Sequence, residues 1–396
     1  MRMTRAELCG LLLGRQGLLV EQGSGGVAGA ANWVRTHGFL MLETAARALA
    51  PGHDLVLYNR LPGYQAGDLD MALYDGGQLI EHYLHVLGAL PAADYALLCD
   101  PPRAAAAARG GSAGALVLAC LTAEGPCTLR DLQAHLRDTQ AGGARAVAQA
   151  VYELHASGAI LVRRREGSGA LYDLAVRVLP GCAAQVLPAE ERLHGLAYRT
   201  LHVLAPVTRA TWSQVLGSLG SRTGLGVSAL KREKGRVIAE LLARGEAEQV
   251  EVQDGAQPYF VPAAWLAAME RSAYKPAPRL SFLSPIDPIV WDGRRALDLF
   301  GFDVRRQAYL PTIRERRLAP PALAILYGQV LVGRLQAQMN WGEERFTVRG
   351  IHLEGQARLE ERHFRTAFAD AVRSLAAWHG AREIRAAGPV PPRLLP

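Results

Sequence analysis

The sequence predicts an α+β protein in which tandem winged-helix domains are followed by a C-terminal β-barrel-like domain with a terminal helix. Two observations predict this fold class. Between residues 113 and 176, and again between 189 and 261, three helical patterns are followed by a hairpin pattern. After residue 280, strand-like runs separated by glycines come before one long amphipathic pattern.

The totals indicate several domains with a basic surface. A chain of 396 residues is too long for one hydrophobic core, and its 49% hydrophobic and 20% charged residues are typical of globular proteins. We expect an N-terminal helical or winged-helix-like domain over 1–108, winged helices over 109–186 and 187–272, and a β-rich domain over 273–396. The net charge of +7 favours a polyanionic partner.

Cysteine spacing and hydropathy exclude several protein classes. The five cysteines are scattered and never form a CxxC pair, so the spacing predicts neither a disulfide framework nor a zinc finger. The first helical pattern carries charges, and no apolar run is long enough to span a bilayer. We expect a monomeric cytoplasmic protein, associated with the nucleoid and not with a membrane.

The first hundred residues contain a motif that permits a second interpretation. After a helical pattern over 4–22, Gly23 to Ala28 matches G-x-G-x-x-A, and Glu43 follows at about the distance of a ribose-binding acid, roughly 20 residues. A dinucleotide-binding fold would next need alternating strands and helices, but residues 54–97 give short helical patterns with a turn at Pro62-Gly63. A dinucleotide-binding enzyme is therefore the weakest alternative.

The first repeat of the helix-and-hairpin pattern runs from residue 113 to residue 176. Helices are expected over 113–121, 128–136 and 143–156, and a hairpin is expected over 160–176. In the third helix, Arg145, Gln149 and Tyr152 lie on the face opposite the apolar positions, where a recognition helix meets the major groove. Arg163, Arg164 and Arg165 lie on the hairpin and would contact phosphates, unless they form an ordinary solvated strand.

The second repeat has its basic residues on the third helix. Helices are expected over 189–204, 209–219 and 227–244, and Asp254-Gly255 predicts a hairpin turn. The densest basic cluster of the chain consists of Lys231, Arg232, Lys234 and Arg236. The hairpin itself is acidic, so this repeat would contact DNA through its helix. Tandem winged helices favour double-stranded DNA, damaged or intact, as the partner, although such domains also dock proteins.

The last third of the chain is predicted to be rich in strands. Strand patterns cover 323–327, 329–335 and 345–353, and a helix is expected over 356–378. The tail after Gly388 is rich in proline, and we expect it to be disordered.

Five segments together resemble a known family. They are SPIDPIVWDGRR at 284–295, LFGFD at 299–303, LVGR at 331–334, EHYLH at 81–85 and LP at 90–91. The chain is identified by them as a member of the winged-helix bacterial DNA glycosylases typified by AlkZ and YcaQ. The resemblance implies tandem winged helices packed with a β-barrel-like domain, a DNA-binding cleft, and excision of alkylated or crosslinked bases without metal or cofactor.

The resemblance also implies which residues carry the chemistry. The family motif of Gln, an aliphatic residue and then Gln or Asp precedes a segment that matches residues 59–64, so it falls on Met41, Leu42 and Glu43. The acid is one methylene longer than aspartate, and methionine replaces the first glutamine. Tyr83 occupies the position of a family tryptophan, and His85 follows it, although a buried structural histidine is the common alternative.

Glu43 is suited to this chemistry, whereas Met41 is not. Cleavage of an N-glycosidic bond passes through an oxocarbenium-like state, which a carboxylate stabilises while it accepts a proton from water. Met41 cannot orient water. We therefore expect a DNA-repair-type protein that is either a divergent monofunctional glycosylase, a hydrolase with Glu43 as the water-activating carboxylate, or a non-catalytic damage sensor or transcriptional regulator. Arg47 and Arg60 are phosphate contacts or ion-pair partners; Arg47 would pair with Glu43 one helical turn away if both are surface residues.

Overall fold

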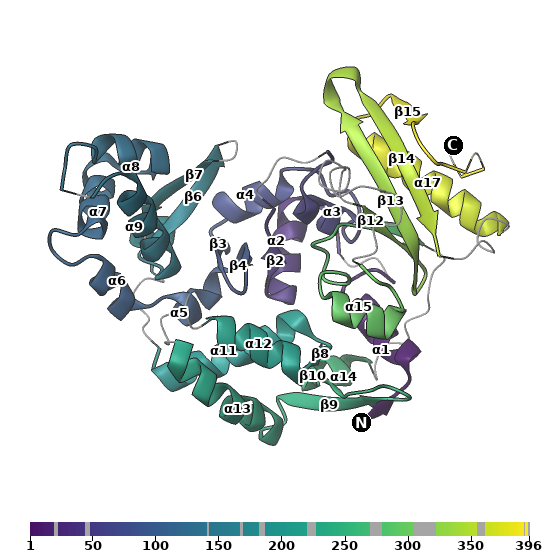
Figure 1. Ribbon diagram of the computed structural model, residues 1–396, viewed down its shortest axis with the longest axis horizontal. Coiled ribbons are helices and arrows are strands. Elements are labelled where there is room, and N and C mark those ends of the chain that lie inside the picture. The colour runs from purple at the N-terminus through teal and green to yellow at the C-terminus, as the bar shows by residue number, and fades with distance from the viewer. Residues whose placement is uncertain are drawn as a thin grey trace.

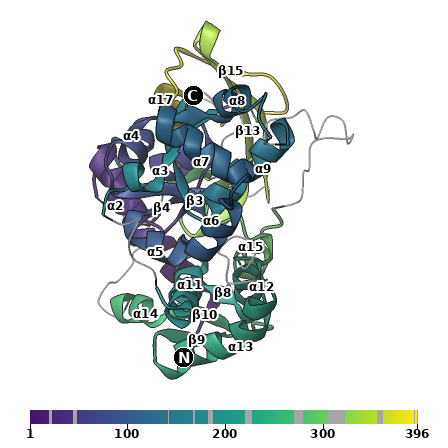
Figure 2. The same cartoon turned by 90° about the vertical axis from the view of Figure 1, so that its left-hand side faces the viewer.

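The computed structural model describes residues 1–396 except 20–22, 44–47, 141, 167–168, 182–186, 220–226, 270–278, 305–321, 355–360, 392 and 395–396. The described residues form four units, and Figure 1 shows one of them in the middle of the molecule with the other three around it. In the turned view of Figure 2, the second of the two helix-and-hairpin units lies at the lower end and the C-terminal helix and strand lie at the upper end.

The central unit is a small antiparallel sheet with helices packed on it. Its elements are α2 (Gly26–His37), β2 (Leu40–Met41), α3 (Gly52–Tyr58), α4 (Asp68–Tyr74), β3 (Leu79–Tyr83), β4 (Leu87–Pro91), the 3-10 helix η1 (Ala92–Asp94) and α5 (Tyr95–Leu98). The strand order is β2-β4-β3, and both pairings are antiparallel. The β3–β4 hairpin lies where short helical patterns were expected. Because β2 does not pair in parallel with a strand before α2, the described residues do not form the unit that binds dinucleotides.

The first module, which follows the linking helix α6 (Pro101–Ala107), has the element order expected for residues 113–176. It consists of α7 (Ala113–Glu124), β5 (Cys127–Thr128), α8 (Leu129–His135), α9 (Ala144–Ala156), β6 (Ile160–Glu166), β7 (Gly169–Leu174) and α10 (Ala175–Val178). Its three strands pair in the order β5-β7-β6. Val117, Leu132, Val151 and their neighbours form an apolar core that belongs to this module alone.

The second module repeats this order but shares its core with other parts of the chain. Its elements are α11 (Ala189–Leu204), β8 (Val207–Thr208), α12 (Arg209–Leu219), α13 (Val227–Ala243), β9 (Ala247–Val252), β10 (Tyr259–Pro262) and α14 (Ala263–Met269). The chain's first strand, β1 (Arg2–Met3), pairs in parallel with β9 and extends the sheet. Leu8 of α1 (Arg5–Arg15) and Leu84 of the hairpin lie in the same apolar cluster as Trp212.

The C-terminal unit is an open sheet covered by one long helix. Its elements are β11 (Leu280–Leu283), α15 (Gly293–Phe300), β12 (Leu323–Tyr327), β13 (Val330–Asn340), the 3-10 helix η2 (Trp341–Glu343), β14 (Arg345–Leu353), α17 (Arg362–Trp378) and β15 (Glu383–Ala386). The five strands follow the order β11-β12-β13-β14-β15. Phe364 and Phe368 of α17 are fully buried against this sheet.

Two expectations about the C-terminal unit are wrong. No sheet among the described residues closes into a barrel, because the end strands β11 and β15 do not pair with each other. The tail after Gly388 is not uniformly disordered, because Leu394 is fully buried in the same apolar cluster as Phe364. The initial helix is also shorter than expected and ends at Arg15. The expected domain boundaries stay predictions.

Candidate functional site

Strand β2 places Met41 and Glu43 beside the tip of the β3–β4 hairpin. Met41 pairs with Gly88 of β4, and the Leu42 amide donates a hydrogen bond to the Leu87 carbonyl at 3.1 Å. A Cβ atom at Gly88 would lie 2.1 Å from the ring of Phe39, so only glycine allows β2 to approach β4 this closely. Glu43 therefore lies at the end of this sheet that also carries the hairpin tip.

The Glu43 carboxylate is held at the start of α3. Its Oε2 accepts a hydrogen bond from the Gly52 amide at 3.0 Å. Amides at the start of a helix carry partial positive charge, so this contact fixes the carboxylate at the helix terminus. The Glu43 amide in turn donates to Nδ1 of His53 at 3.1 Å. Burial lowers the pKa of His53 to about 4, so this imidazole is neutral at pH 7 and carries its proton on Nε2.

A small cavity adjoins Glu43. Its volume is about 20 Å³, which is enough for about one water molecule. The lining residues are mostly apolar: Ala48, Leu49, Ala50, Gly52, Leu55, Pro285, Leu323 and Ala337, together with Glu43 and Ser284. A half-buried carboxylate beside a space for a single water can position that water and accept its proton.

The segment from Ser284 to Arg295 contacts several elements around this cavity. The Ser284 hydroxyl donates to the Gly52 carbonyl at 3.2 Å. Asp287 forms two hydrogen bonds, each of 2.8 Å, with the guanidinium of Arg60. Trp291 packs on His85, with ring centroids 5.1 Å apart. The segment therefore reaches the start of α3, the residues just after α3 and the hairpin tip at once.

The comparisons with known proteins agree on one family. The family model described as DNA glycosylase AlkZ-like matches residues 35–378. The chain belongs to the AlkZ-like DNA glycosylase family. Its structure is similar to that of Streptomyces sahachiroi DNA glycosylase AlkZ, with a TM-score of 0.60, 13% sequence identity, and coverage of 98% of this chain and 100% of the other. Within the described part of the chain, no helix is both long and apolar enough to cross a membrane.

In this AlkZ-like chain, Arg60 has a structural role and not the expected phosphate contact. Its side chain is fully buried, as is that of its partner Asp287. A guanidinium enclosed in this way has no surface on which a phosphate can bind, and its bidentate ion pair ties the central unit to the C-terminal unit. Arg47 lies outside the described residues.

The other expected site residues of the AlkZ-like chain lie around the hairpin but face different neighbours. His85 packs between Phe39 and Trp291, with a centroid distance of 4.9 Å to Phe39. Tyr83 instead faces the first module, where its ring lies 5.9 Å from that of Tyr152. Met41 packs against the apolar cluster that includes Leu84. The structure thus brings Met41, Glu43 and His85 to one end of the sheet, while Tyr83 is an interface residue.

Glu81 has a role that the sequence did not predict. It is completely buried and forms an ion pair with Arg165, whose Nε lies 2.9 Å from its Oε2. The Tyr74 hydroxyl donates to the same carboxylate at 2.6 Å. Arg165 of the first module was expected to contact a phosphate. That expectation is wrong, because its guanidinium is paired with Glu81. Its guanidinium holds the module on β3.

The remaining positions expected to bind DNA lie on the two modules. Those exposed to solvent are Arg145, Gln149, Arg163, Arg164, Lys231, Arg232 and Arg236. Gln149 donates to Glu153 at 2.9 Å, and Arg236 forms ion pairs with Glu190, Glu233 and Glu240. Lys234 is half-buried and donates to the Ser213 carbonyl at 3.4 Å. Of the expected set, Lys231 and Arg232 therefore lie most openly on α13.

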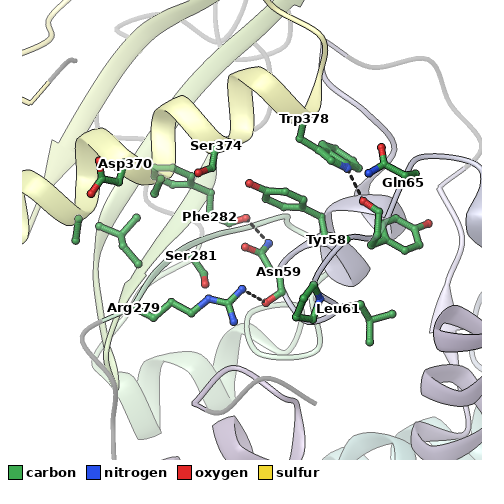
Figure 3. A pocket seen from close by; sticks show the side chains of 16 residues that line it. Tyr58, Asn59, Leu61, Gln65, Arg279, Ser281, Phe282, Asp370, Ser374 and Trp378 are labelled. Carbon is green, nitrogen blue, oxygen red and sulfur yellow. Dashed lines mark hydrogen bonds between the residues drawn. The ribbon is translucent and has the colours of Figure 1, made fainter. Parts of the chain in front are cut away.

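A larger pocket lies at the other end of α3. Figure 3 shows its walls, which come from the central unit and from the C-terminal sheet and helix, and its volume is about 520 Å³. Its polar groups already join these units: Asn59 donates to the Phe282 carbonyl, Arg279 to the Asn59 carbonyl and Trp378 to the Tyr64 carbonyl, each at 2.9 Å. Because these contacts are structural, Glu43 remains the better candidate for chemistry.

Proposed function

We propose that this AlkZ-like protein binds double-stranded DNA and hydrolyses the N-glycosidic bond of an alkylated or crosslinked base, with Glu43 as the catalytic carboxylate. One observation carries the proposal. The Glu43 side chain is fixed by the Gly52 amide and lines a cavity with room for about one water molecule. Glu43 also falls where family members have their acid or amide.

The chemistry needs little more than this carboxylate. An alkylated purine is already cationic and leaves readily, so catalysis consists of placing water and stabilising positive charge on the sugar. Glu43 would accept the proton of the attacking water as the bond to the base breaks. The helix-terminal amide at Gly52 holds the carboxylate in position for this task. The proposal requires no metal or cofactor at this site.

DNA would be bound by the two modules acting as winged helices. Lys231 and Arg232 on α13, and Arg145, Arg163 and Arg164 on the first module, are exposed and would contact phosphates. In this proposal the protein works as a cytoplasmic, nucleoid-associated monomer. Arg60 and Arg165 take no part in the contact, because buried carboxylates already bind them.

A second candidate function is a damage sensor or regulator without catalysis. Met41 favours it, because its side chain is apolar and packs against the core where the family motif has glutamine. The loss of one preorganised polar group costs about 10²–10³ in rate. The contact between Glu43 and Gly52 can also be explained as a cap on α3.

The experiment uses duplexes that carry N7- or N3-alkylpurines and an interstrand-crosslinked duplex. Wild type is expected to produce abasic sites on at least one of them, and Glu43→Ala, which removes both the acid and the amide that the family motif allows, is expected to bind the same duplex without producing abasic sites. Tight binding without abasic sites over the whole lesion panel would overturn the enzymatic proposal and favour the sensor. If wild type does not bind any of the duplexes, both candidates fail.

A further inference from the structure

Three side chains of the first module meet at one point outside the candidate site. They are Cys120 of α7, Cys127 of β5 and His135 of α8, and their sulfur and nitrogen ligand atoms all lie within 4.8 Å of one another. We propose that these three residues bind a zinc ion. The proposal is independent of the activity assigned to Glu43, since it concerns a different part of the molecule.

Local structure explains why the three residues converge. The chain leaves α7 at Gly125 and returns through β5, where Cys127 pairs with Tyr172 of β7. A capping box then starts α8: the Thr128 amide donates to the Asp131 carboxylate at 2.9 Å, and the Asp131 amide donates back to the Thr128 hydroxyl at 3.2 Å. The helix that begins here ends with His135, so its last turn lies near Cys120.

The ligand set suits zinc. Two thiolates and an imidazole are soft and borderline ligands, which Zn²⁺ binds in tetrahedral geometry. Two thiolates also balance the charge of the ion. His135 is exposed while Cys127 is buried, so the fourth position of the tetrahedron faces the surface and is open to water. Three protein ligands with one open position is a known zinc arrangement.

The charges around the cluster favour a cation. The carboxylate of Asp131 lies close enough to Cys127 to act on its thiol electrostatically. Glu124 acts on both thiols in the same direction. The negative potential that opposes a thiolate is the one that attracts Zn²⁺. Because the ion must displace the thiol protons, affinity should rise with pH.

The sequence did not predict this site because the spacing is unusual. Six residues separate the cysteines and seven separate Cys127 from His135. Zinc-finger patterns place their cysteines two to four residues apart in one turn. Here three different elements each supply one ligand, so only the folded module brings them together.

The test measures zinc binding by the full chain, without an affinity tag and after metal has been removed with a chelator. Zn²⁺ alone is added in competition with a chromophoric chelator, and the bound metal is counted. Wild type should bind one equivalent. Loss of one ligand should cost at least as much as loss of a supporting contact, so His135→Ala should bind at least about 10-fold more weakly. The matched control is His363→Ala, which removes an exposed histidine from α17.

A second measurement keeps the test independent of folding defects. Cobalt(II) bound by thiolates gives a charge-transfer absorption, which wild type and His363→Ala should show and Cys120→Ser should lose. Zn²⁺ should also raise the melting temperature of wild type but not that of His135→Ala. The proposal is overturned if wild type binds no zinc, if His135→Ala binds it as tightly, or if the freshly purified chain holds a Cys120–Cys127 disulfide that forms without oxidant.

Discussion

Glu43 and Glu81 are two carboxylates of the same three-stranded sheet, and their surroundings are opposite. Glu81 lies within β3, is completely buried, and is bound by Arg165 and Tyr74. Glu43 follows β2, is half-buried, and is held by the backbone amide of Gly52 beside a cavity with room for one water. A backbone amide fixes a carboxylate without neutralising its charge, whereas a buried guanidinium neutralises it.

The difference separates a structural acid from one that is suited to chemistry. A carboxylate that must stabilise a cationic transition state needs its charge and access to water. Glu43 has both. The charge of Glu81 is instead neutralised by the ion pair that joins the central unit to the first module. Burial, which often marks functional acids, therefore marks the structural acid of this pair.

Removal of the ion-pair partner of Glu81 tests whether this carboxylate stabilises the fold. Arg165→Ala leaves a buried carboxylate without its ion-pair partner, and the free energy of unfolding should fall by about 3–5 kcal/mol. The control is Arg164→Ala on the same strand, where the side chain is exposed and the loss should stay within about 0.5 kcal/mol. Urea unfolding measures both. Equal effects of the two variants would mean that Glu81 is not a structural acid.

The histidines near Glu81 predict a pH dependence of stability. Burial lowers the pKa of His53 and His155 to about 4 and that of His82 to about 3, below the usual 6.5. The unfolded chain therefore binds more protons between pH 6.5 and 4, and their contribution is complete above pH 6.5 and is lost as pH falls toward 4. Asp54 opposes them, since burial raises its pKa to about 6.

Each pKa unit corresponds to about 1.4 kcal/mol, so three histidines outweigh one carboxyl group. The free energy of unfolding in urea should be lower at pH 5 than at pH 7 by about 2 kcal/mol or more. An equal or higher value at pH 5 would show that the histidines around Glu81 are not buried in neutral form.

Arg60 and Arg165 are bound by buried carboxylates, so DNA should be bound by other basic residues. Lys231→Ala combined with Arg232→Ala, the two exposed basic residues of α13, should weaken DNA binding and reduce the slope of log affinity against log salt by about one unit per lost phosphate contact. Arg382→Ala with Arg385→Ala removes the same charge from the exposed C-terminal end and serves as the control. A slope that changes only in the control pair would move the DNA surface to the C-terminal unit.

The smallest expected effect is the contribution of the Glu43 charge to the free energy of unfolding. Glu43→Gln removes a negative charge from the start of α3 and should lower the free energy of unfolding by about 0.5 kcal/mol, the size expected for one charge at a helix terminus. Differential scanning calorimetry compares it with Glu248→Gln, an exposed residue of β9. A loss above about 3 kcal/mol would make Glu43 a structural acid like Glu81.

Much of the architecture could be predicted from periodicity. The helices and hairpins of both modules, the strands β12 and β14 and most of α17 lie where the sequence patterns place them. The β3–β4 hairpin was missed because its residues follow no alternating pattern. Glu81 and His82 face buried partners in another unit, so both sides of β3 are covered and the period of two is lost.

The candidate site could be predicted only in part. The family motif located Glu43, but Gly52, His53 and Ser284 come from segments whose spacing gives no signal. Arg60 and Arg165 could not be assigned from sequence, because a basic side chain beside a buried carboxylate and one on a surface look alike in a composition pattern. The two arginines differ from surface arginines because each has a buried carboxylate partner. These partners, Asp287 for Arg60 and Glu81 for Arg165, lie more than 80 residues away along the chain.

In the proposed reaction, Glu43 is the catalytic carboxylate. The most direct measurement is the single-turnover rate of abasic-site formation on an alkylated duplex, at enzyme concentrations that saturate the DNA. Glu43→Ala should lower this rate by about 10²–10⁴-fold, the range for one acid–base group, while its DNA affinity stays at the wild-type value and Glu248→Ala keeps the full rate. A Glu43→Ala rate within a few-fold of wild type would contradict the claim.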